Sequence, residues 1–133
     1  MDPGPLVKEQ IDAGAMFLAE LEKKMPVAAG FWLKGTDRDY WKFYVVADRF
    51  EGEDRLAAYE EVSRVTAAMR DPNVGPSDVR LIETGKPLAR AVLDYRRLYP
   101  DKVIRLRDRF FGGMAIDEVY IYPSPVAASP VTS

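Results

Sequence analysis

The sequence predicts an α+β fold, in which three helices pack mainly on one face of a mostly antiparallel five-stranded sheet, in the order αββαβαββ. Three segments repeat apolar residues every three or four positions, as amphipathic helices do. Five others alternate or are rich in aromatic and β-branched residues, as strands are. Gly, Pro and Asp clusters separate these segments. A chain of 133 residues is the size of one domain, which we assign to residues 1–122.

The first part of the chain predicts a helix followed by a β-hairpin. Apolar residues recur at helical spacing through 6–25, and Pro26 ends the pattern. The stretches 27–34 and 40–47 hold aromatic and β-branched residues on either side of a loop that contains Gly and Asp. We therefore expect two antiparallel strands here.

The middle of the chain predicts a helix, a strand and another helix. The second helix covers 55–70 and leads through turn-forming residues at 71–78 into a short strand, Val79–Glu83. Pro87 begins the third helix because proline suits the first helical turn. Pro100 ends it.

The last part predicts a second hairpin and a tail. Strands over 102–108 and 114–122 enclose Gly112-Gly113, a dipeptide typical of tight hairpin turns. Residues 123–133 are rich in Pro, Ala and Ser, a composition that predicts a flexible tail.

The composition limits the chemistry, because the chain contains neither histidine nor cysteine. Disulfide bonds, cysteine nucleophiles, Ser-His-Asp triads and histidine-based metal sites are thereby excluded. Any catalysis would depend on carboxylates, Lys, Tyr, Ser or Thr, or on an oxygen-ligated metal. We expect no cofactor and assign no catalytic or metal-binding residue.

The charge and the N-terminus bear on partners and compartment. The net charge of −2 opposes bulk attraction to nucleic acid, although residues 86–109 carry eight basic and three acidic side chains. No stretch reaches the roughly 20 apolar residues that a membrane helix needs. The first residues do not resemble a signal peptide. We expect a cytoplasmic protein that does not act at a membrane.

Alternation along each strand sorts the side chains of the predicted sheet into two sets. We expect an apolar set to meet the helices: Phe31, Leu33, Trp41, Phe43, Val45, Leu81, Ile104, Leu106, Val119 and Ile121. We expect the other set to form an open aromatic and basic face: Trp32, Lys34, Tyr40, Lys42, Tyr44, Arg80, Arg105, Arg107, Arg109, Glu118, Tyr120 and Tyr122.

The open face is the predicted binding surface, with eight candidate residues: Trp32, Lys34, Lys42, Tyr44, Arg105, Arg107, Tyr120 and Tyr122. Because Tyr, Trp and Arg are enriched at interfaces, the sequence favours a non-enzymatic protein-interaction module that pairs with itself or with another protein. Aromatic side chains among cations could instead take single-stranded nucleic acid. Such a face could also be an ordinary solvated surface.

An enzyme is a further alternative, based on the acidic stretch 48–54. It holds Asp48, Glu51, Glu53 and Asp54, which could bind a hard cation in a metal-dependent hydrolase. The spacing does not match a twelve-residue calcium loop. An acidic turn before the second helix explains the stretch more simply, since carboxylates are stabilised at a helix N-terminus.

Three segments carry a pattern-level resemblance to known proteins. They are Phe31-Trp32-Leu33, Tyr40-Trp41-Lys42-Phe43 and Val119-Tyr120-Ile121-Tyr122, following an initial helix. Across residues 6–122 this arrangement resembles small uncharacterised bacterial α+β proteins. No activity is assigned to that group, so the resemblance implies a fold and transfers no site residue.

Overall fold

The computed structural model describes residues 6–38, 40–48 and 53–123. Its helices are α1 (Lys8–Glu22), α2 (Glu53–Met69) and α3 (Pro87–Leu98), with a short 3-10 turn, η1 (Pro76–Asp78). Its strands are β1 (Ala29–Gly35), β2 (Lys42–Ala47), β3 (Val79–Glu83), β4 (Ile104–Phe111) and β5 (Met114–Ile121). The predicted order of elements is confirmed. From residue 124 onward the predicted tail lies outside the described residues.

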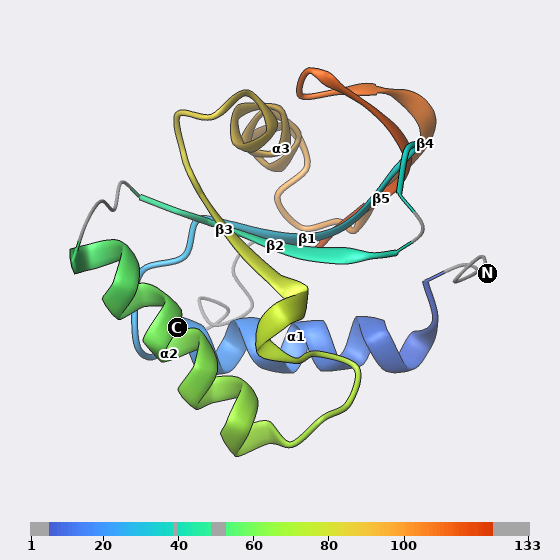
Figure 1. Cartoon of the computed structure of the whole chain (residues 1–133). Helices are drawn as coiled ribbons and strands as arrows, with labels where there is room; N and C mark the ends of the chain where they lie inside the picture. The colour runs from blue at the N-terminus through green and yellow to red at the C-terminus, as the bar shows by residue number, and fades with distance from the viewer. Residues whose placement is uncertain (1–5, 39, 49–52, 124–133) are drawn as a thin grey trace.

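The strands form one sheet in the order β3-β2-β1-β5-β4 (Figure 1). Antiparallel pairing joins β2 to β1, β1 to β5 and β5 to β4, whereas β2 and β3 are parallel. The α+β class is confirmed, and the sheet is mixed rather than mostly antiparallel. Parallel neighbours need a crossover connection, which α2 supplies between β2 and β3.

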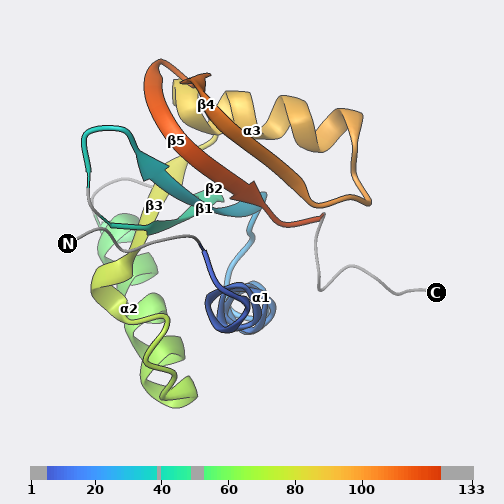
Figure 2. The ribbon, with the colours of Figure 1, turned by 90° about the vertical axis from the view of Figure 1, so that its right-hand side faces the viewer.

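The helices cover both faces of the sheet. Figures 1 and 2 show α1 and α2 below it and α3 above it. The expectation that one face stays open is therefore wrong. The physical reason lies in the topology: the chain leaves β3 at one edge of the sheet and enters β4 at the other, so the segment between them, α3, crosses the sheet.

The central strand β1 is consequently buried on both sides. Phe31, Trp32 and Leu33 are each at most 2% exposed. Trp32 belongs to the core between the sheet and helices α1 and α2, together with Phe17 of α1. Phe31 and Leu33 belong to the core between the sheet and α3. Consecutive buried residues are typical of a strand covered on two faces.

The hairpin of β4 and β5 curls around α3 (Figure 2). Gly112 and Gly113 both have positive φ, at 59° and 86°, and connect the register partners Phe111 and Met114. The predicted two-residue turn is thus confirmed.

Candidate functional site

The register of the first hairpin determines which residues share a face. Phe31 lies opposite Tyr44, and Trp32 lies opposite Phe43. Since directly opposed residues point to the same side, Phe43 shares a face with Trp32 and not with Phe31. The same pairing through β5 puts Arg105 on the face of Trp32. The predicted division into one apolar face and one aromatic and basic face is therefore wrong.

Three of the eight predicted binding residues lie in the core between α1 and the sheet. Trp32 is 1%, Tyr122 3% and Tyr120 8% exposed. The Trp32 indole N–H donates to the Tyr122 hydroxyl at 3.0 Å, and that hydroxyl donates to the carbonyl of Ile11 at 2.6 Å. Burial raises the pKa of Tyr122 well above its ordinary value. These rings hold α1 on the sheet and are not accessible to a partner.

Three further predicted residues are paired with carboxylates. Lys34 bonds Asp117 at 2.6 Å, which lowers the pKa of that carboxyl. Arg105 donates to Glu118 and lies over the Tyr120 ring, with 5.4 Å from its guanidinium carbon to the ring centroid. Arg107 approaches the same Glu118 at 3.7 Å. Each of these three cations is thus paired with a carboxylate, and Arg105 and Arg107 share the single negative charge of Glu118.

The other two predicted residues, Lys42 and Tyr44, lie on a different surface, together with three neighbours. We call it the β2–β3 patch: Arg38, Tyr40, Lys42, Tyr44 and Arg80. Tyr44 and Arg80 are register partners on adjacent strands, and Lys42 precedes Tyr44 by two residues, so these three share one face. Arg38 donates to the Tyr40 hydroxyl at 2.8 Å.

Contacts between the rings and cations organise the β2–β3 patch. Tyr40 is 47% exposed. Lys42 Nζ lies 5.4 Å and the Arg38 guanidinium carbon 5.8 Å from the centroid of its ring. Lys42 also donates to the carbonyl of Ser77 at 3.0 Å. Tyr44 is half-buried and stacks on Phe31, with 5.1 Å between ring centroids. Arg38 and Arg80 are exposed.

The patch carries three positive charges, and Asp37, the residue before Arg38, is an acid that acts electrostatically on Arg38. Within the described residues, no carboxylate forms an ion pair with Arg38, Lys42 or Arg80. Burial raises the pKa of Tyr44, and the nearby Arg38 and Arg80 act in the opposite direction. Asp39 lies outside the described residues. The arrangement provides guanidinium, ammonium and phenol donors for an anionic group.

Sequence reasoning missed Arg38 because it lies in the loop before β2. A signal was present, since Arg38, Tyr40, Lys42 and Tyr44 follow one another at a spacing of two. The sequence groups Arg80 with Lys42 and Tyr44, as the structure does, but the proximity of Arg80 to Tyr44 depends on the parallel pairing of β2 with β3.

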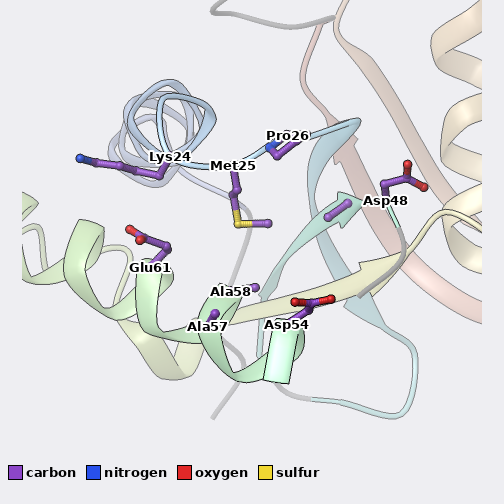
Figure 3. A pocket seen from close by; sticks show the side chains of 9 residues that line it. Lys24, Met25, Pro26, Asp48, Asp54, Ala57, Ala58 and Glu61 are labelled. Carbon is purple, nitrogen blue, oxygen red and sulfur yellow. The ribbon is translucent and has the colours of Figure 1, made fainter. Parts of the chain in front are cut away.

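The acidic stretch contributes to a separate pocket of about 400 Å³, shown in Figure 3. Met25, Pro26 and Ala58 line it with Asp48 and Asp54, where the end of α1, the end of β2 and the start of α2 meet. Residues 49–52 lie outside the described part of the chain. Among the described residues there is no group of three His, Cys, Asp or Glu side chains arranged to hold a metal. The hydrolase alternative stays a prediction.

None of the helices in the described ranges combines the length and apolar composition needed to cross a bilayer. The chain matches no family model, no curated protein and no solved structure. The geometry of the β2–β3 patch is therefore the basis for a functional proposal.

Proposed function

We propose that this chain is a non-enzymatic binding module that holds an acidic segment of a partner protein on the β2–β3 patch. The observation that carries the proposal is the grouping of Arg38, Lys42 and Arg80 around two tyrosines with no carboxylate paired to them in the described structure. The other basic candidates, Lys34, Arg105 and Arg107, pair with Asp117 or Glu118. An acidic segment supplies the missing negative charge.

A protein partner fits the patch better than single-stranded nucleic acid. Oligonucleotide platforms stack successive bases on exposed rings. Here the Tyr44 ring stacks on Phe31, and the Tyr40 ring has Arg38 and Lys42 beside it. Since the net charge of −2 also opposes nucleic acid, the rings serve to position cations rather than to receive bases.

The partner is a different molecule rather than a second copy bound through the same patch. A two-fold interface brings a surface against itself. Patch-to-patch contact would oppose three cations with three cations, which is unfavourable.

The test is a charge reversal with a matched control. We expect Arg38→Glu combined with Arg80→Glu to weaken binding of a labelled oligoglutamate peptide by roughly tenfold or more in fluorescence anisotropy, a loss of about 1.4 kcal/mol. The control reverses Arg90 and Arg97, which are exposed on α3 outside the patch. It changes the net charge equally and should bind almost as wild type.

Three results would contradict the proposal. Equal weakening in both variants would mean that the peptide senses only net charge, and no binding to the wild type would remove the patch as an acidic-segment site. Tighter binding of a single-stranded oligonucleotide than of the peptide, lost in the patch variant, would assign the patch to nucleic acid instead.

A further inference from the structure

The number of donors on the β2–β3 patch exceeds what one carboxylate can use. A carboxylate has two oxygens with about four acceptor positions, and a single guanidinium can fill two of them through two parallel hydrogen bonds. Arg38 uses one N–H on Tyr40, and Lys42 uses one on Ser77, so both retain free donors beside those of Arg80. A glutamate bound by one arginine would leave the other two cations uncompensated.

A phosphomonoester matches the patch more closely. It carries about −1.5 to −2 charges at pH 7 and three terminal oxygens, which two arginines and a lysine can share. The cations come from three segments: Arg38 from the loop before β2, Lys42 from β2 and Arg80 from β3. Donors from different segments can approach one tetrahedral group from different directions.

The rings prepare this arrangement before a ligand binds. Tyr40 holds Arg38 through its hydroxyl and lies beside Lys42. Tyr44 is opposite Arg80, and its ring is held by stacking on Phe31. Side chains that are already ordered lose less conformational freedom on binding.

We infer that the β2–β3 patch recognises a phosphorylated serine or threonine within the acidic segment of its partner. The inference rests on the proposed function and deepens it, because it names the group that the three cations share.

The experiment compares three peptides of one acidic sequence that carry phosphoserine, glutamate or serine at one central position. We expect the wild-type protein to bind the phosphoserine peptide roughly tenfold more tightly than the glutamate peptide. The preference should fall as the pH drops below about 6, where the phosphate loses its second charge, while glutamate stays ionised to about pH 4.3.

A conservative variant of Arg80 tests whether the patch needs a planar guanidinium or only a positive charge. Arg80→Lys keeps the net charge but removes the guanidinium, so it should reduce the preference for phosphoserine while still binding the glutamate peptide. Arg97→Lys on α3 is the matched control and should leave the preference unchanged. Circular dichroism of both variants checks that each is folded.

The outcomes distinguish the two proposals. Equal binding of the phosphoserine and glutamate peptides overturns the inference and leaves the proposed function standing. Binding of none of the acidic peptides overturns both. Tighter binding of a single-stranded oligonucleotide than of the phosphoserine peptide overturns the inference in favour of nucleic-acid phosphates.

Discussion

At the scale of single residues, Gly14 lets Tyr122 reach the backbone of α1. A Cβ atom on Gly14 would lie 2.2 Å from the Tyr122 hydroxyl and 2.8 Å from the Trp32 indole nitrogen. We expect Gly14→Ala to lower the free energy of unfolding by about 1–3 kcal/mol, because a clash in a packed core outweighs the better helix propensity of alanine. Urea unfolding measures the change.

The control for Gly14 is Ser63→Ala at an exposed position of α2, which should change stability little. Tyr122→Phe removes the hydroxyl and leaves the buried Trp32 N–H without its partner, a loss of about 1–3 kcal/mol. Because the hydroxyl is also what the new methyl meets, the double variant should lose less than the sum of the single losses. Strict additivity would contradict the proposed contact.

At the scale of elements, the turn between β4 and β5 is fitted against the start of α3. A Cβ atom on Gly112 would lie 2.5 Å from the Leu88 Cα atom, whereas one on Gly113 would have nothing within 4 Å. Both glycines have positive φ, so alanine at either position costs about 1–2 kcal/mol in backbone strain. Only Gly112→Ala adds a collision with backbone.

We therefore expect Gly112→Ala to lower the melting temperature clearly more than Gly113→Ala. The excess should be accompanied by faster hydrogen exchange of amides in α3, since the collision pushes the hairpin away from that helix. If the two variants are equally destabilised, the turn does not support α3.

Element by element, the sequence predicts most of the fold for local reasons. The sequence marks a helix end at Pro26, a helix start at Pro87 and a turn at Gly112-Gly113. Each of these three features depends only on neighbouring backbone geometry. Alternation likewise divides each strand into two sets. It does not say which sets of two strands share a face, since that depends on the register of their pairing.

Across the whole molecule, the position of α3 is what local patterns could not supply. The uninterrupted apolar run around Phe31-Trp32-Leu33 was a signal for a strand buried on both faces. The candidate site was predicted only in part: Lys42 and Tyr44 lie on the β2–β3 patch, while Trp32, Tyr120 and Tyr122 are core residues. These three residues are buried by a helix that is distant in the sequence, and Arg105 and Arg107 pair with Glu118 on another strand. Both effects join segments that are far apart in the chain, so local patterns do not predict them.

The whole molecule also has a characteristic dependence of stability on pH. It has no histidine, so no side chain with an ordinary pKa titrates between about pH 6 and 8. Lys34 lowers the pKa of Asp117, so the stability from that pair is present above the unfolded pKa of the carboxyl and is lost only as the pH falls below it. The melting temperature should be flat near neutrality.

On the alkaline side, burial raises the pKa of Tyr44, Tyr120 and Tyr122 above the ordinary value of 10.0. The folded state then keeps phenol protons that the unfolded chain releases, so stability is full below about pH 10 and declines as the pH rises further. Thermal unfolding followed from pH 6 to 11 measures this decline. Tyr122→Phe should lower stability near neutrality but make the alkaline decline shallower, because one of the three buried phenols no longer titrates. An equally steep decline in that variant would show that Tyr122 ionises as readily in the folded protein as in the unfolded chain, and would argue against its buried position beneath α1.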